Sequence, residues 1–265
     1  MSNIWLRNIQ IITGGRKFNY PDLDITFTTN FDSDTVPDES DISIYNLTDS
    51  TIANIKKGQQ ITLAAGYGRD VGTILDGVIS DATLVKNDTD RELQIKALNV
   101  TSDYLNHTIN YTYGKGSGSE HIIRDVLGYI GIIPNEVSLH NPITYYHGFA
   151  ANGKIKDVVN RLARDAGGKV IIRNSSITIV DNNSKGDWDT AWLLNSKTGL
   201  IDISPIDDTN TIAKYKITTF LNHAIAPYTV LKIQSLTFNG MALVIDGSHK
   251  ADDSNFETEA NILPL

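Results

Sequence analysis

The sequence predicts a mainly β chain with an α/β insert in its middle. Apolar and polar residues alternate with the period of half-buried strands in 1–99 and again in 188–265. Between these parts, apolar residues recur at helical spacing in two segments. Glycine and asparagine residues separate the strands. We therefore predict a β domain at 1–99, an α/β insert domain at 100–187 and a second β domain at 188–265.

Composition narrows the classes of function. The 265 residues carry a formal net charge of −8, 40% of them are hydrophobic, and cysteine is absent. A chain without cysteine forms no disulfide, thiolate metal site or cysteine nucleophile. The acidic balance opposes specific nucleic-acid binding, which needs clustered lysine and arginine. No run approaches the roughly 18–20 apolar residues that cross a membrane, so we expect no membrane span.

The first β part is predicted to hold six strands and one short helix, which is typical of a small barrel or sandwich. The strands are predicted at Trp5–Ile12, Leu23–Thr28, Ile42–Tyr45, Gln60–Tyr67, Gly72–Val85 and Arg91–Asn99. Thr48 is placed to cap a helix that runs to Ile55. Asp76-Gly77 lies inside the longest strand and predicts a bulge or a bend there, as in a strand that turns a barrel corner.

The insert is predicted to contain two helices and a hairpin. Ser117 and Glu120 have capping-box spacing ahead of the first helix, and the second helix runs from Asn152 to Asp165. The hairpin turns near Asn174-Ser175. In the second β part, Asn239-Gly240 predicts a two-residue turn. That part is short for a barrel, so either it borrows strands from 100–113 or its boundary is misplaced.

The sequence contains no recognisable catalytic or ligand-binding motif. Gly114–Ser119 precedes a helix, but it matches neither the phosphate-binding P-loop nor the dinucleotide fingerprint, and we interpret it as a flexible loop. His121 and Asp125 lie one helical turn apart, which gives two ligands where a metal site needs more. Glu257 and Glu259 share one strand face, as any solvated pair does. We predict no catalytic residue, no metal and no cofactor.

Two stretches carry a more specific pattern than alternation. The strand beginning at Ile42 ends in the corner Tyr45-Asn46-Leu47, and a short helix leads through Lys57-Gly58 into a strand that ends in Ala65-Gly66-Tyr67. Near the other end, a strand within 238–252 closes with Gly247-Ser248-His249 before a polar loop. These residues and the element order resemble the central hub proteins of phage tail baseplates and of related tail-like particles.

This resemblance implies a structural function in a virion. It implies two tail-tube-like antiparallel β-barrel domains separated by the small α/β domain. It also implies a homotrimeric ring that adapts the six-fold tail tube to a three-fold spike and lines the channel for DNA ejection. The implied partners are the tail tube protein, a spike or tail-tip protein and the tape-measure protein, with assembly in the bacterial cytoplasm. We expect the corner residues Tyr45, Asn46, Leu47 and Ile52, together with Tyr67, to contribute to subunit contacts.

Two other classes of function stay open at this point. One is a cell-wall-directed enzyme of the tail tip, a peptidoglycan hydrolase, although no convincing acid–base pair supports it. The other is a carbohydrate-binding module, in which exposed aromatic residues stack on sugar rings. Trp188 and Trp192 are the residues that we expect to make such aromatic contacts, and packing at a domain junction is the competing explanation for both.

Overall fold

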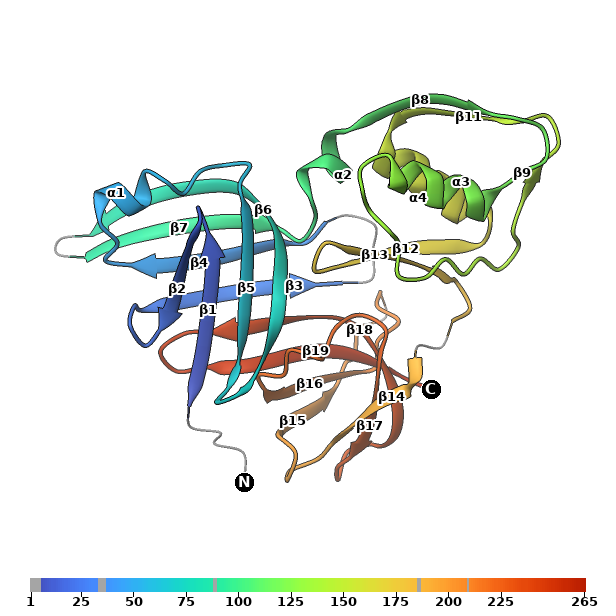
Figure 1. The fold of residues 1–265 in the computed structure, drawn as a ribbon. Coiled ribbons are helices and arrows are strands. Elements are labelled where there is room, and N and C mark those ends of the chain that lie inside the picture. Colours follow the sequence, from blue (N-terminus) through green and yellow to red (C-terminus); the bar gives the residue numbers. More distant parts are fainter. Residues whose placement is uncertain (1–5, 33–36, 88–89, 185–186, 209) are drawn as a thin grey trace. The chain divides into compact units, whose positions relative to one another are not determined.

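The computed structural model describes residues 6–32, 37–87, 90–184, 187–208 and 210–265 (Figure 1). The described chain divides into two compact units. The β unit combines the chain up to Leu98 with the chain from Lys185 onward, and the insert unit is mainly Asn99–Ser184. Because both β parts lie in one unit, their division into separate domains stays a prediction. No helix in these ranges is long and apolar enough to cross a membrane.

The first half of the β unit contains all the predicted strands and one more. Its strands are β1 (Arg7–Thr13), β2 (Arg16–Tyr20), β3 (Ile25–Phe31), β4 (Glu39–Tyr45), β5 (Gln60–Tyr67), β6 (Asp70–Asn87) and β7 (Asp90–Leu98). Trp5, where the first strand was predicted to begin, lies outside the described residues. The additional strand is β2, which forms a hairpin with β1.

The predicted cap of the short helix is confirmed, whereas the predicted bulge is wrong. Helix α1 (Asp49–Ile52) begins after Thr48, whose Oγ1 accepts a hydrogen bond from the Thr51 amide at 3.4 Å. Asp76 and Gly77 pair regularly with β5. The register of β6 shifts instead before and after them, at Ile74 against β5 and at Ser80 against β7, and the strand's pairing passes from β5 to β7 at Val78.

The second half of the β unit contains β14 (Asp187–Leu194), β15 (Leu200–Pro205), β16 (Tyr215–Phe220), β17 (Thr229–Gln234), β18 (Asn239–Ala251) and β19 (Phe256–Pro264). The predicted Asn239-Gly240 turn is wrong, because both residues pair with β17. The turn is Ser235–Phe238, in which the Ser235 hydroxyl donates to the Phe238 carbonyl and accepts from its amide, both at 2.9 Å.

All strands of the β unit belong to one sheet. Its main path runs β15-β16-β19-β18-β3-β4-β7-β6-β5-β1-β2, and β17 branches from β18 and pairs with β14. The order β3-β4-β7-β6-β5-β1 is matched by β15-β16-β19-β18-β17-β14. Ladders in both series are antiparallel, apart from the parallel pair β14–β17. The two halves therefore repeat one strand-pairing pattern, although their sequences show no repeat.

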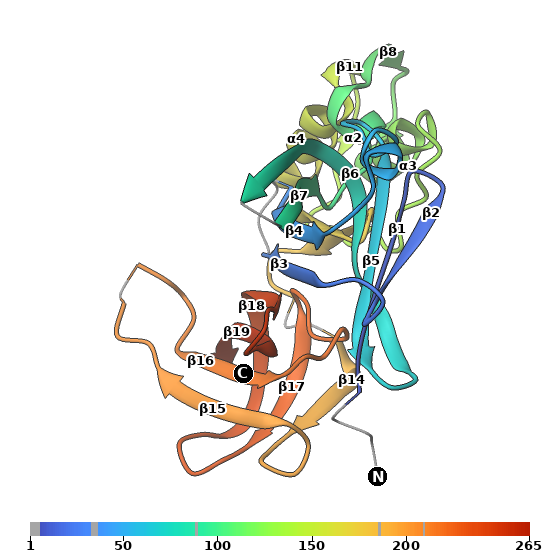
Figure 2. The same cartoon turned by 90° about the vertical axis from the view of Figure 1, so that its left-hand side faces the viewer.

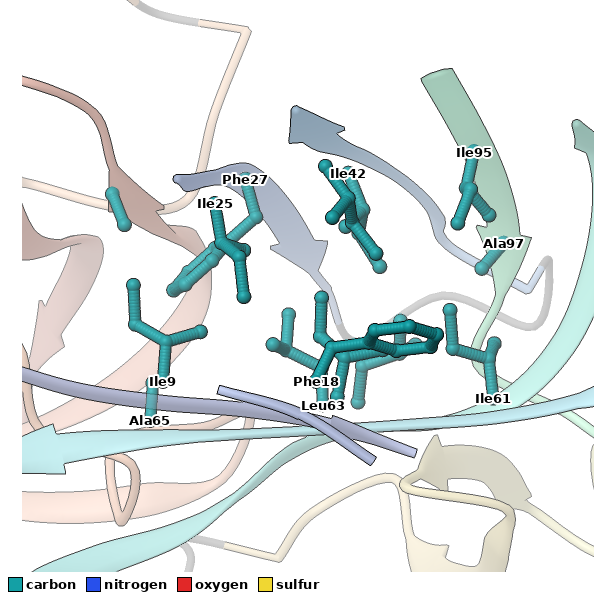
Figure 3. Packing of buried hydrophobic residues seen from close by; sticks show 14 of the residues in the cluster. Ile9, Phe18, Ile25, Phe27, Ile42, Ile61, Leu63, Ala65, Ile95 and Ala97 are labelled. Atoms are coloured by element: carbon teal, nitrogen blue, oxygen red, sulfur yellow. The ribbon is translucent and has the colours of Figure 1, made fainter. Parts of the chain in front are cut away.

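Each half has its own apolar cluster. In the first half, β1, β2 and β5 face β3, β4 and β7, and Figure 3 shows Ile42 and Ile95 pointing toward Leu63 and Phe18 across this core. The second cluster is built around Ile217, Leu231, Val244, Ala260 and Ile262. Along β4, β7 and β19, more buried residues alternate with less buried ones, and this alternation leaves the opposite face of these strands polar.

The insert unit folds around two packed helices. Its elements are α2 (Ser102–Asn106), β8 (Thr108–Tyr113), β9 (Ser117–Gly118), α3 (Ser119–Gly128), β10 (Thr144–Tyr145), β11 (Phe149–Lys154), α4 (Ile155–Asp165), β12 (Gly168–Arg173) and β13 (Ser176–Asp181). The hairpin turn at Asn174-Ser175 is confirmed, since both residues have positive φ. The capping box is wrong: Gly118 is the N-cap of α3, and the Ser117 hydroxyl donates to the Gly114 carbonyl. Strand β8 pairs with β11, so the second β part borrows no strand from it.

Asp252 closes the turn between β18 and β19. Its Oδ1 accepts hydrogen bonds from the amides of Ser254 (2.8 Å) and Asn255 (2.7 Å), and its Oδ2 lies 2.9 Å from Lys250 Nζ. These contacts hold the pKa of Asp252 well below its ordinary value. The hydrogen bond from the Asn255 side chain has the largest effect, and the one from Lys250 has the next largest. The ionised carboxylate is therefore the form that holds the turn together.

We expect Asp252→Ala to lower the free energy of unfolding by about 1–2 kcal/mol at pH 7, because the turn amides lose their acceptor. A lowered folded-state pKa gives stability that is complete above the unfolded-state pKa of about 4 and is lost as pH falls through the folded-state pKa. The difference between variant and parent should therefore shrink in acid. Urea unfolding at pH 7 and at pH 2 measures it. Asp253→Ala is the matched control, and equal losses in the two variants would contradict the assignment.

Candidate functional site

The main candidate site is the polar face of the central strands. We call it the central polar face: the side of β15, β16, β19, β18, β3, β4, β7 and the second half of β6 that points away from the apolar clusters. It crosses from one half of the unit to the other without interruption, because β3 pairs with β18. Both views of the ribbon place these two strands side by side (Figures 1 and 2).

Directly paired residues form rows across this face. Cross-strand partners share a face, so pairing defines which side chains are neighbours. One row joins six strands, from β19 through β18, β3, β4 and β7 to β6; it consists of Glu257, Lys250, Thr28, Asp41, Lys96 and Asp81. Acidic and basic side chains are therefore interspersed along a single surface.

The charged groups of the face hold one another in place. Lys96 Nζ lies 2.6 Å from Glu39 Oε1 and 3.5 Å from Asp41 Oδ1, and these carboxylates raise the pKa of the lysine. Lys216 Nζ lies 2.8 Å from Glu259 Oε2. Exposed ion pairs of this kind contribute little to stability. They therefore shape the surface more than they hold the fold together.

Carboxylates outnumber amines on this face. The acidic residues on it include Glu39, Asp41, Asp81, Glu92, Asp202, Asp246, Glu257 and Glu259. The basic residues include Lys96, Lys216 and Lys250. Two of the acids are fixed by neutral donors at 2.6 Å: Glu92 by the Ser43 hydroxyl and Asp246 by the Asn261 amide. A polar surface with an acidic excess repels phosphate rather than binding it.

The corner residues that the sequence singled out lie in different environments. Tyr45 is half-buried on the central polar face, and burial, followed by the charge of Glu92, raises its pKa. Asn46 has positive φ and pairs with Arg91 through its backbone. Leu47 is buried in the first cluster, and Ile52 packs against it. Their role in contacts between chains stays a prediction, which the exposed Asn46 suits better than the buried Leu47.

Tyr67 makes its contacts inside the chain. Its hydroxyl donates to the Phe256 carbonyl at 2.8 Å, and its ring meets the Phe256 ring edge-on at 5.0 Å between centroids. It therefore joins β5 of the first half to β19 of the second half. Trp192 lies on β14 and is 47% exposed. Trp188 lies on the same strand, but its side chain is outside the described residues.

The other residues examined for chemistry have structural contacts. Asp125 Oδ2 accepts a hydrogen bond from the Tyr113 hydroxyl at 2.7 Å, and the His121 ring lies edge-on to the same tyrosine. His140 Nδ1 lies 3.2 Å from Asp181 Oδ2. Within the described ranges, no group of three or more histidine or acidic residues is arranged to hold a metal ion.

Sequence reasoning missed the central polar face, although its signal was present. Glu92, Gln94 and Lys96 alternate with buried residues along β7, and Asp41 and Ser43 do so along β4. Alternation shows that each strand has a polar side. It does not show that those sides join into one surface, because the β3–β18 pairing connects residues more than 200 positions apart.

Comparison with known proteins identifies the fold. No protein-family model and no curated protein matches the sequence. Among solved structures, the 43 kDa tail protein of prophage MuSo2 from Shewanella oneidensis superposes with a TM-score of 0.68 at 11% identity, covering 97% of this chain and 98% of that one. The tail protein from Neisseria meningitidis MC58 gives a TM-score of 0.68 at 8% identity, with coverages of 98% and 97%.

A third match comes from a secretion system. An E. coli component of the type VI secretion system, which has structural similarity to the T4 bacteriophage tail proteins gp27 and gp5, gives a TM-score of 0.66 at 13% identity. The match covers 96% of this chain and 76% of that one. Identities this low show a shared fold and nothing finer. The chain therefore has the mainly β fold of phage tail proteins, as the resemblance in its sequence predicted.

Proposed function

We propose that this chain is a non-enzymatic structural hub of a phage tail or of a related tail-like particle. In this proposal it forms a homotrimeric ring in the virion, which is assembled in the host cytoplasm and joins the six-fold tail tube to a three-fold spike. The tail tube protein, a spike or tail-tip protein and the tape-measure protein are its partners. The fold shared with tail proteins along nearly the whole chain supports this role.

The repeated strand order supports the proposed match between six-fold and three-fold symmetry. One chain holds the pairing pattern twice, once in each half of the β unit. Three chains related by a three-fold axis therefore present six copies of the pattern in a ring. Such a ring offers similar surfaces at six positions on one side and a three-fold arrangement of insert units elsewhere. This is the geometry that an adaptor between six-fold and three-fold structures needs.

The charge of the central polar face supports a position for this face along the channel. A ring of closed contacts has an inner and an outer surface, and DNA that passes through must not be held by the wall. The acidic excess on this face repels phosphate at short range. We propose that the central polar face lines the channel, and that the two β domains at 1–99 and 188–265 each contribute part of that lining.

Measurement of the oligomeric state tests the proposed function. We expect size-exclusion chromatography with light scattering to give three times the 29.1 kDa chain mass. Negative-stain class averages should show a three-fold ring with a central hole about as wide as a DNA duplex. A monomer at every concentration tested would contradict the proposal. Release of fragments from purified peptidoglycan would instead favour the tail-tip enzyme that the sequence left open.

A further inference from the structure

The surface beside helix α3 of the insert unit contains a hollow of about 500 Å³. We call it the α3 hollow; it is lined by His121, Arg124, Asp125, Gly128 and Tyr129. The first four lie along one side of α3 at intervals that return to the same helix face, and Tyr129 is the C-cap residue of that helix. All five belong to the insert unit, so the hollow is formed within one compact unit.

Exposed tyrosine rings lie at the α3 hollow. Tyr129 lines it directly and is 52% exposed. Tyr111 on β8 lies beside Tyr129, with 6.2 Å between the two ring centroids, and is 48% exposed. Tyr113 on the same strand is buried and supports Tyr111 through an edge-on contact with 4.9 Å between centroids. Two aromatic rings therefore stay about half exposed beside one hollow, and a ligand in the hollow would cover them.

The fold leaves most polar groups of the α3 hollow unused. Within the described ranges, the Arg124 guanidinium and the His121 ring nitrogens make no hydrogen bond or ion pair with another residue. Asp125 Oδ2 accepts a hydrogen bond from the Tyr113 hydroxyl at 2.7 Å, whereas Oδ1 accepts none from a described residue. Burial, followed by this hydrogen bond, raises the pKa of Tyr113, so its hydroxyl remains a donor. The hollow thus holds an oriented carboxylate beside an uncommitted guanidinium.

Gly128 keeps the α3 hollow open. Glycine is a poor helix former, yet Gly128 is the last residue of α3. Its backbone does not require glycine, because its φ is not positive. A Cβ at this position would meet no atom within 4 Å. The missing side chain therefore leaves space on the helix surface rather than relieving a close contact, and that space belongs to the hollow.

We propose that the α3 hollow binds a neutral pyranose saccharide. The negative face of an aromatic ring attracts the C–H groups on one side of a pyranose, and Tyr129 and Tyr111 provide such rings. Sugar hydroxyls both donate and accept hydrogen bonds, so they satisfy the Asp125 acceptor and the Arg124 donors together. The inference goes beyond the proposed hub function, because it needs neither a ring nor a second chain.

The charges of the α3 hollow favour a neutral ligand. Arg124 and Asp125 both line it. A phosphate or carboxylate group would meet the like charge of Asp125, and an ammonium group would meet that of Arg124. A hydroxyl-rich neutral ring meets neither repulsion. The saccharide site therefore lies in the insert unit, whereas the aromatic residues that the sequence pointed to, Trp188 and Trp192, lie on β14 of the β unit.

Glycan binding by the full chain tests this site. The probe is an array of neutral and anionic pyranose glycans from bacterial surface polysaccharides, followed by titration calorimetry with the glycan that binds best. We expect a neutral glycan to bind, and Tyr129→Ala and Arg124→Ala each to weaken its binding about tenfold, through the loss of a ring contact or of hydrogen bonds. Tyr146→Ala is the matched control: Tyr146 is 76% exposed and does not line the hollow, so this variant should bind as the parent does.

Two substitutions at Gly128 test the space itself. Alanine and methionine are both good helix formers, so Gly128→Ala and Gly128→Met should fold as the parent does. Gly128→Met fills the hollow and should abolish binding, whereas Gly128→Ala should keep most of it. If Gly128→Met does not fold, Arg124→Ala and Tyr129→Ala decide the question.

The outcomes separate this site from the proposed hub function. Binding of no glycan, binding of anionic glycans alone, or equal binding by the parent and Gly128→Met would each overturn the site. Loss of binding in Trp192→Ala but not in Tyr129→Ala would place the saccharide on β14 and would also overturn it. Light scattering of the same samples measures the oligomeric state independently, so a trimer that binds no glycan would leave the hub function standing.

Discussion

Replacing Gly247 with alanine should lower the free energy of unfolding of the β unit by about 3 kcal/mol, at the upper end of the usual cost of overpacking. A Cβ at this position would lie 2.2 Å from the Glu259 carbonyl oxygen and 2.7 Å from Phe31 Cζ. The carbonyl belongs to the neighbouring strand β19, and the Phe31 ring is part of the second apolar cluster.

The cost should fall on the link between the two halves, because Gly247 pairs directly with Phe31 across the β3–β18 junction. Urea unfolding followed by circular dichroism measures it. Ser248→Ala is the matched control: it changes the next residue of the same strand, on the central polar face, and should stay within about 0.5 kcal/mol of the parent. If the urea concentration at the midpoint of unfolding is the same for Gly247→Ala and the parent, the strands can move apart at this position without loss of stability, which would contradict the prediction.

Local sequence signals predicted most of the strands. The predictions of turns and bulges were wrong where contacts with distant residues determine the backbone. Asn239-Gly240 has the composition of a tight turn, yet it lies in β18 because the Ser235 hydroxyl closes an earlier turn. Asp76-Gly77 has the composition of a bulge, yet β6 shifts register at Ser80. A strand must bend where its partners change, and the sequence of that strand alone does not contain its partners.

The candidate site shows the same limit. The contact that Tyr67 makes between chains stays a prediction, and the hydrogen bond from its hydroxyl to Phe256, 189 positions away in the same chain, could not be predicted from the residues around it. The repeat of the two halves lies in pairing order and in matching bulges rather than in residue identity. Apolar cores accept many side chains of suitable volume, so two such halves can share a fold without sharing a recognisable sequence.

Reversing three acidic residues of the central polar face should create DNA binding. We expect Asp41→Lys/Asp81→Lys/Glu92→Lys to bind duplex DNA at least about tenfold more tightly than the parent at 50 mM salt, and to lose that gain by about 200 mM. Asp41 and Asp81 both pair with Lys96, so two new lysines lie beside an existing one. Fluorescence anisotropy across a salt series measures the affinity and the number of phosphate contacts.

A control with the same change in net charge separates position from charge. Asp22, Glu120 and Glu136 are exposed acidic residues that do not belong to the strands of the central polar face, and Asp22→Lys/Glu120→Lys/Glu136→Lys distributes the new charge over both units. In a ring lined by the central polar face, the first variant brings nine new lysines together around the channel, whereas the control brings none there. The salt dependence should then be steeper for the first variant, since each additional phosphate contact adds about 0.9 to the slope. Equal affinity and slope in the two variants would mean that net charge alone governs binding and that this face does not line the path of DNA.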